Sequence, residues 1–186
     1  TPMRAAQALA RIGVRAFGDD GLLSAVVREI EGEGFGVVGA EQVLGALAAR
    51  AGAYGRVAPS ATDHEDIARG VAVLRALGAV DVGQAVVVER GVVLGIEAIE
   101  GTDALVARCR ALRREASGGV LVKIAKPSQE RRVDLPTIGT RTVEAVADAG
   151  LAGIAVEAGR ALVADGRAVA AAADARGVFV FGLSTP

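Results

Sequence analysis

Aromatic residues are scarce in this chain of 186 residues: they make up 3% of the sequence, and tryptophan is absent. The chain has one cysteine, Cys109, and one histidine, His64. A single cysteine excludes an intrachain disulfide and fits a reducing compartment. One cysteine and one histidine are also too few to complete a usual zinc site. The core must therefore be built from alanine, valine, leucine and isoleucine.

Long apolar runs and a strong net charge are also missing. No apolar run approaches the length of a membrane-spanning helix. The net charge is -1, which gives no concentrated basic face for nucleic acid, so we expect no nucleic-acid partner. Hydrophobic residues nevertheless make up 52% of the sequence, enough for one buried core.

The first part of the chain has mainly helical spacing of its apolar residues. The predicted elements are a helix over 3–17, a second helix through 22–30, a short strand over 35–39 and a helix over 41–50. The chain opens directly on a helical pattern, so we expect the beginning of an N-terminal domain to be missing. Residues 51–66 are polar and rich in turn formers, and we interpret them as a linker.

The remaining sequence alternates apolar runs with helical patterns. The predicted elements are a helix over 67–77, a hairpin of strands 85–88 and 92–96, a helix from 103, a strand over 119–122, a helix over 140–149, strands over 153–156 and 161–164, a helix over 168–175 and a strand over 178–181. Near-continuous apolar strands between helices predict an α/β fold with a mixed sheet and helices on both faces. We therefore divide the chain into the tail of a mainly helical N-terminal domain (1–50), a linker (51–66) and a C-terminal domain (67–186).

One strand-to-helix connection carries a concentration of charge. Residues 123–139 read K-I-A-K-P-S-Q-E-R-R-V-D-L-P-T-I-G. Cations on a loop beside a helix N-terminus suit a phosphate ligand, and the carboxylate of Asp134 is what magnesium would need to join that phosphate. Taken singly, these cations could merely solubilise a loop and Asp134 could cap a turn. Together they predict a phosphate or diphosphate site.

Acidic residues also follow the predicted strand over 92–96. Glu97 and Glu100 bracket its end, and Thr102 and Asp103 begin the next helix. In α/β sheets, ligands bind at the ends of strands. The alternative is that Thr102 caps the helix and Asp103 complements its dipole. Glu97 is poorly placed at the end of an apolar strand unless another group pairs with it.

Other candidate motifs have simpler readings. The G-x-G-x-x-G pattern at 34–39 lies inside a candidate strand rather than after one, which disfavours dinucleotide binding, and the sequence contains no P-loop. We interpret His64 as a solvated loop residue and Cys109 as part of the core. Glu157 and Arg160 follow another strand and either close the same pocket or form an ordinary turn ion pair.

Three long motifs together resemble one family. They are K-x-x-K-P-x-Q-x-x-R-x-D-L-P-T-I-G, the upstream G-I-E-A-I-E-G-T-D and the downstream A-G-L-A-G-I-A-V-E-A-G-R. They resemble the LpxI-type UDP-2,3-diacylglucosamine pyrophosphatases of lipid A biosynthesis, found in Gram-negative bacteria that lack the commoner, unrelated enzyme. The family has two domains, and the glycine-rich start of its N-terminal domain is missing here. In the family the aspartate of D-L-P-T-I-G, here Asp134, is closely tied to activity.

The resemblance implies magnesium-dependent hydrolysis of UDP-2,3-diacylglucosamine to UMP and 2,3-diacylglucosamine 1-phosphate. We predict that Asp134, with Glu97 or Glu100, holds Mg²⁺ against the diphosphate, and that Gln129 orients water or a sugar hydroxyl. The predicted catalytic residues are Asp134, Lys123 and Gln129; the substrate-binding residues are Lys126, Arg132, Thr137, Thr102, Glu157 and Arg160; and the metal ligands are Asp134, Glu97 and Glu100.

A substrate with fatty chains implies a cytoplasmic protein that touches the inner membrane peripherally. The oligomeric state stays open, with a homodimer among the alternatives. Two rival functions use the same residues differently. A non-catalytic phosphosugar- or nucleotide-binding regulatory domain would need the cations but neither Asp134 nor magnesium, and a purely structural α/β domain would need none of them.

Overall fold

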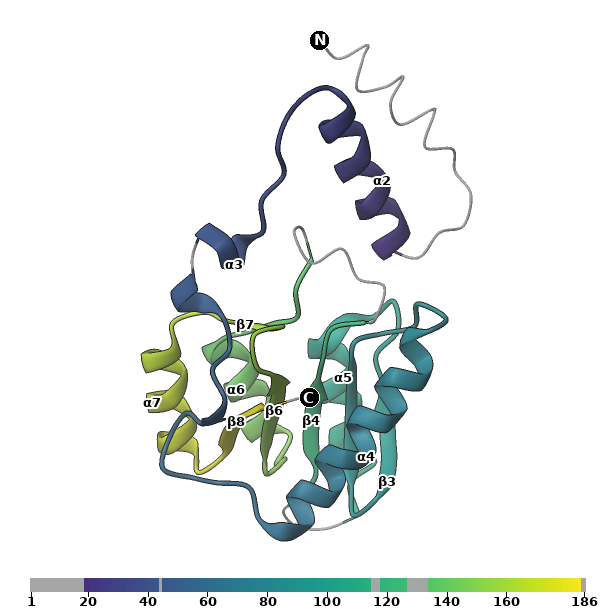
Figure 1. Cartoon of the computed structure of the whole chain (residues 1–186). Helices are drawn as coiled ribbons and strands as arrows, with labels where there is room; N and C mark the ends of the chain where they lie inside the picture. The colour runs from purple at the N-terminus through teal and green to yellow at the C-terminus, as the bar shows by residue number, and fades with distance from the viewer. Residues whose placement is uncertain (1–18, 44, 115–117, 127–133, 185–186) are drawn as a thin grey trace.

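A computed structural model describes residues 19–43, 45–114, 118–126 and 134–184 of the chain (Figure 1). The helix predicted over 3–17 lies outside these residues. Among the described helices, none combines the length and the apolar character that crossing a lipid bilayer requires.

A mixed sheet of six strands forms the centre of the fold, in the order β1-β8-β6-β4-β2-β3. The strands are β1 (Gly52–Ala53), β2 (Ala85–Glu89), β3 (Val92–Ile96), β4 (Val120–Lys123), β6 (Gly153–Glu157) and β8 (Phe179–Leu183). Strands β4, β6 and β8 are parallel, whereas β1, β2 and β3 pair antiparallel with their neighbours. The predicted mixed sheet and its hairpin are confirmed. Two short strands, β5 (Thr137–Ile138) and β7 (Leu162–Val163), form a separate parallel pair.

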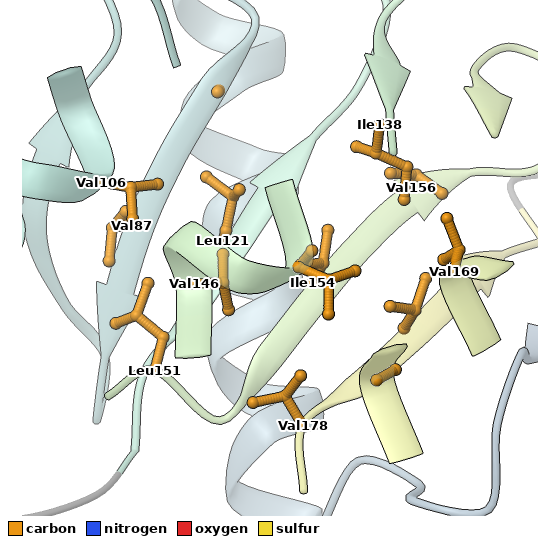
Figure 2. Packing of buried hydrophobic residues seen from close by; sticks show 14 of the residues in the cluster. Val87, Val106, Leu121, Ile138, Val146, Leu151, Ile154, Val156, Val169 and Val178 are labelled. Atoms are coloured by element: carbon orange, nitrogen blue, oxygen red, sulfur yellow. The ribbon is translucent and has the colours of Figure 1, made fainter. Parts of the chain in front are cut away.

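Helices cover both faces of this sheet, as predicted (Figure 1). The helices are α2 (Asp19–Gly32), α3 (Ala40–Val43), a 3₁₀ turn (Gly45–Leu47), α4 (Ala61–Gly78), α5 (Gly101–Arg110), α6 (Thr140–Asp148) and α7 (Gly166–Arg176). Helix α4 packs on one face, where Ile67 and Leu74 meet strand residues such as Val122. Helices α5, α6 and α7 pack on the other face, and Figure 2 shows Val146 of α6 beside Leu121 and Ile154 of neighbouring strands. The sequence therefore folds into three layers with an aliphatic core, as its composition requires.

Helix α4 lies unusually close to the sheet because it carries a glycine at the contact. A Cβ atom on Gly70 would come within 2.6 Å of Cγ2 of Val122. Glycine inside a helix costs roughly 0.5–1 kcal/mol of stability relative to alanine. At Gly70 this loss of helix propensity permits close packing of the helix against the sheet. The valines of β2 and β4 can then be fully buried beneath the helix.

The stretch 51–66, which we interpreted as a linker, belongs to the sheet-containing part of the structure. It contains β1, whose Gly52 pairs with Gly182 of β8, and it contains the first turns of α4. Helix α4 begins six residues before the expected start because Ser60 and Asp63 form a capping box, each accepting a hydrogen bond from the other's backbone N–H. His64 therefore lies on a helix rather than in a loop, with its ring 5.5 Å from that of Phe181.

The segment before β1 also differs from its prediction. Residues 35–39 form no strand in the structure, and the helix expected over 41–50 is reduced to α3 and a 3₁₀ turn. Tertiary contacts explain the shortened helix: Ala48 forms a bridge with Leu162, and the N–H of Ala49 donates to the carbonyl of Ala161. A backbone that pairs with a neighbouring strand cannot also continue a helix.

Candidate active site at the strand ends

The ends of several strands meet along one edge of the sheet. Strands β4 and β6 end there at Lys123 and Glu157, and Glu97 directly follows the end of β3. Because Ala85 of β2 pairs with Lys123, the loop before β2 reaches the same edge. Glu97, Lys123 and Glu157 are all buried. Moving a charged group out of water costs free energy, so buried charged groups are usually paired. The partners of these three residues therefore show how the site is organised.

A chain of hydrogen bonds joins Glu97 to Lys123 through Thr102. Nζ of Lys123 donates to Oγ1 of Thr102 over 2.9 Å, and that hydroxyl donates to Oε1 of Glu97 over 2.6 Å. Nζ also donates to the carbonyl oxygen of Thr137 over 3.3 Å. The N–H of Gln84 donates to Oε2 of Glu97 over 3.0 Å. Both oxygens of Glu97 are thus oriented, and Lys123 is held between the start of α5 and strand β5.

Electrostatics connect Lys123 to Asp134 as well. Burial lowers the pKa of the Lys123 ammonium below its ordinary value, and the negative charges of Glu97, Asp134 and Asp103 oppose that shift. The carboxylate of Asp134 therefore lies close enough to influence the charge of Lys123. These two residues were predicted to act together, and the structure brings them to the same place.

A cavity of about 550 Å³ opens above this network. Glu97, Lys126 and Asp134 line it together, and Asp134 is half-buried rather than fully exposed. Nζ of Lys126 lies 2.5 Å from Oδ1 of Asp81, which lines the cavity from the loop after α4. The cavity is thus lined by groups of both charge signs. The exposed aliphatic side chain of Ile99 also lines it.

Glu100 is separated from this group, although we predicted it as a metal ligand. Its Oε1 accepts from Nε and Nη2 of Arg108, over 3.1 and 2.9 Å, and its Oε2 accepts from the N–H of Ala98. A hydrogen bond with its own backbone N–H and the Arg108 guanidinium hold the pKa of Glu100 below its ordinary value. Glu100 does not line the cavity, so its arrangement serves the loop before α5.

The other predicted substrate-binding residues have varied surroundings. Nη1 of Arg160 lies 3.6 Å from Oε1 of Glu157. The two residues therefore form the turn ion pair that was one of the two interpretations of their sequence. The exposed hydroxyl of Thr137 donates to the carbonyl of Leu135, so Thr137 contributes to the network through its backbone. Gln129, Arg131 and Arg132 lie outside the described residues. Thr102 does not cap α5, because its hydroxyl is directed to Glu97.

Sequence reasoning missed the loop that carries Asp81 and Gln84. This loop packs tightly against the end of β3: Gly83 has a φ of +53°, and a Cβ atom there would lie 2.0 Å from the carbonyl oxygen of Glu97. The only local signal was an acid between two valines, V-D-V-G, directly after a helix. Its partner Lys126 is 45 residues away along the chain, too far for any spacing rule.

The residues present fit a magnesium ion of the kind that phosphate enzymes use. Within the described part of the chain, no three carboxylate, histidine or cysteine side chains converge to form an all-protein metal cage. Mg²⁺ is commonly held by one or two carboxylates together with substrate phosphates, and it keeps several waters. Asp134 and Glu97 border one cavity and supply that donor set.

This geometry defines a three-layer α/β domain whose strand-end cavity is lined by Lys126 and by carboxylates and suits a phosphorylated ligand. The family model of the LpxI C-terminal domain matches residues 50–181, and the chain belongs to this family. The match begins just before β1, in agreement with the place of residues 51–66 in the fold. The resemblance found in the three motifs is thereby confirmed.

One relative is the UDP-2,3-diacylglucosamine pyrophosphatase LpxI of Caulobacter vibrioides. The two sequences are 49% identical over 172 residues, which cover 89% of this chain and 61% of the relative. The chain thus spans about three fifths of the length of that curated relative.

Proposed function

We propose that this protein hydrolyses the diphosphate of UDP-2,3-diacylglucosamine in a magnesium-dependent reaction of lipid A biosynthesis. Water adds across the P–O–P linkage: its oxygen bonds to one phosphorus as the bond between that phosphorus and the bridging oxygen breaks, and the bridging oxygen leaves with the other phosphate. The products are UMP and 2,3-diacylglucosamine 1-phosphate. The observation that carries the proposal is the convergence of Asp134, Glu97 and Lys126 on one cavity above the buried Lys123. The relative from Caulobacter vibrioides is a UDP-2,3-diacylglucosamine pyrophosphatase, which supports the choice of substrate.

The lysines would bind and stabilise the phosphate oxygens. Lys126 lies on the cavity wall, where a phosphate could take over part of its interaction with Asp81. Lys123 lies beneath, fixed by Thr102 and the Thr137 carbonyl, so its charge is already oriented before a ligand binds. Preorganised charges of this kind stabilise the negative charge that develops as the bridging bond breaks. Arg132 and Gln129 keep their predicted roles in binding the leaving phosphate and orienting water.

Asp134 and Glu97 would hold Mg²⁺ at the cavity. When bound there, the ion would supply neutralisation of the diphosphate oxygens. Glu97 is ready for this role because Thr102 and the N–H of Gln84 fix its carboxylate. Glu100 fits the role less well, because it does not line the cavity and its carboxylate is paired with the guanidinium of Arg108.

The same substrate supports a place of action. We propose that the protein works in the cytoplasm and touches the inner membrane peripherally, because its substrate carries two acyl chains. A homodimer remains an open alternative.

Metal-dependent release of UMP tests this function. The chain and the Caulobacter relative would be incubated with UDP-2,3-diacylglucosamine, with magnesium and with excess EDTA, and UMP would be measured. We expect release by both proteins with magnesium, and its loss with EDTA and recovery on adding back the ion. UMP release that is unchanged by EDTA would contradict the proposed dependence on magnesium. A folded chain that binds the substrate but releases no UMP, beside an active relative, would favour the rival role of a binding module.

A further inference from the structure

Lysine occurs at two positions in this chain, and both lie at the candidate site. Of the 21 lysine and arginine residues, only Lys123 and Lys126 are lysines. Lys123 ends β4, and Lys126 lines the cavity. An arginine guanidinium is a planar fork that suits one bidentate partner, whereas a lysine ammonium carries three donors about one point. A lysine can therefore bind a carboxylate and a phosphate oxygen at the same time.

Lys126 has an acidic partner on the loop after α4. Its Nζ lies 2.5 Å from Oδ1 of Asp81. The side chain of Lys126 is 10% exposed and that of Asp81 is 27% exposed, so water screens this pair less than an ion pair on the open surface. Both residues line the cavity that Glu97 and Asp134 also border. The ion pair therefore lies beside the groups that would bind magnesium and the diphosphate.

Asp81 adopts a backbone conformation that favours glycine. Its φ is +57°, just after the end of α4. The N–H of Asp81 donates to the carbonyl of Gly78. The N–H of Val82 donates to the carbonyl of Leu77, and the two bonds together form the Schellman pattern, whose left-handed position is usually glycine. An aspartate there costs conformational free energy that a glycine would not, which indicates a role for its side chain.

We propose that Asp81 is a positioning residue, which holds the ammonium of Lys126 at the cavity wall where the diphosphate binds. The inference rests on the proposed function and deepens it. Fixing a flexible lysine in advance lowers the entropic cost of placing its charge, and that charge matters most as the bridging bond breaks. A carboxylate near the diphosphate also repels it. Because orientation and repulsion oppose each other in substrate binding, removing Asp81 should change KM little and lower kcat.

Two rival roles for Asp81 make different predictions. As a tie between the loop after α4 and the end of β4, it would affect the stability of the fold but not kcat. As a further magnesium ligand, it would set the magnesium concentration that gives half-maximal activity. Among the described residues, no three acidic side chains converge on one point, which disfavours a joint metal site of Asp81, Glu97 and Asp134. The contact with Lys126 favours the positioning role.

Two substitutions of Asp81 test the inference by kinetics. Asp81→Asn removes the charge and keeps a residue that tolerates a positive φ, whereas Asp81→Gly removes the side chain and relieves the backbone. We expect kcat for UMP release to fall roughly tenfold in both, with KM and the magnesium requirement within about twofold of the parent. Asp81→Gly should be the more stable of the two in urea. Asp174→Asn, which alters a partly buried carboxylate paired with Arg56 away from the cavity, is the matched control and should keep its kcat.

A double-mutant cycle shows whether Asp81 acts through Lys126. In the Lys126→Met background, Asp81→Asn should change kcat by less than about twofold, because the group that it positions is already gone. The same tenfold fall in both backgrounds would overturn the inference. A raised magnesium requirement in Asp81→Asn would assign the carboxylate to the metal, and an unchanged kcat with lower stability would make it a structural tie.

Nitrogen NMR separates this inference from the proposed reaction. Because the chain has two lysines, protein made with lysine isotopically labelled at Nζ gives one ammonium signal for each, and Lys126→Met assigns them. If the parent released no UMP from any substrate, the proposed function would fail. A Lys126 signal that responds to inorganic diphosphate with magnesium in the parent, and that Asp81→Asn shifts, would still support the positioning role. A Lys126 signal that Asp81→Asn leaves unchanged would contradict it.

Discussion

The two ends of the central sheet both bury acidic residues, but they satisfy them differently. At the end opposite the candidate site, Asp66 accepts from the backbone N–H groups of Arg90 and Gly91, over 2.9 and 2.6 Å. Glu89 accepts from the N–H of Arg114 and lies 3.7 Å from Nε of Arg113. These acids tie turns and loops to the sheet.

At the strand ends that carry the candidate site, buried charges are joined through side chains. Glu97, Thr102 and Lys123 form one network, and Asp134 and Lys126 border the cavity above it. A cavity of about 580 Å³ also lies at the opposite end, bordered by Asp66 and Glu89. Neither the burial of a charge nor the size of a cavity therefore separates the two ends. The connection between charges does: at the candidate site the hydroxyl of Thr102 joins a buried carboxylate to a buried lysine, whereas Asp66 at the opposite end accepts from two backbone N–H groups.

The largest expected effect is loss of activity in Asp134→Asn. This change removes the carboxylate charge from the cavity wall and should lower kcat about a hundredfold or more. Because Asp134 is only half-buried, the substitution should leave the free energy of unfolding nearly unchanged. UMP release and urea unfolding would be measured on the same preparation. Asp148→Asn, which alters a surface pair with Arg176, is the matched control, and full activity in Asp134→Asn would remove Asp134 from the site.

At the opposite end, Asp66→Ala should do the reverse. It leaves the N–H groups of Arg90 and Gly91 without their acceptor, which should cost roughly 1–3 kcal/mol of stability. Urea unfolding measures this loss, and KM and kcat should stay unchanged where the protein is folded. A catalytic defect in folded Asp66→Ala, at unchanged stability, would break the distinction between the two ends.

Thr102→Val should have a smaller effect on the reaction. The change preserves shape but removes the hydroxyl that accepts from Lys123 and donates to Glu97. We expect roughly a tenfold fall in kcat, about 1.4 kcal/mol, with KM less affected. Thr102→Ser restores the hydroxyl and should recover most of the activity. Equal activity in the two variants would show that the network does not position the lysine.

The smallest expected effect concerns Lys123 and pH. Because burial lowers the pKa of Lys123 below 10.5 in the folded state, the unfolded chain binds more protons between the two pKa values. The contribution of Lys123 to stability should therefore rise with pH in that window. Unfolding free energies of the parent and Lys123→Met, compared from about pH 8 to about pH 10, would show the difference shifting in favour of the parent. A difference that moves in the opposite direction would mean that the charged partners outweigh burial.

Much of the fold could be read from periodicity. The hairpin of β2 and β3, the apolar β4 and β6 and the amphipathic α6 were predicted because their side-chain patterns match the geometry of each element. The start of α4 was missed because its capping residues and polar face resemble a polar connector. Residues 48–49 were missed for another reason, since they pair with a segment more than a hundred residues away.

The candidate site was predictable only in outline. Glu97, Lys123 and Asp134 could be grouped because strand ends gather at the edge of an α/β sheet. Asp81 contacts Lys126 and Thr102 contacts Lys123, and these partners are 45 and 21 residues apart along the chain, so local spacing could not predict either contact.

Local sequence patterns thus established the aliphatic α/β core, the family and the charged connection after β4, because periodicity and motif spacing act over a few neighbouring residues. Only the tertiary structure shows which partners these charged groups contact: Glu100 pairs with Arg108, Glu97 with Thr102 and Lys126 with Asp81. The physical reason is range, since hydrogen bonds and ion pairs form between atoms a few ångströms apart, wherever their residues stand in the chain.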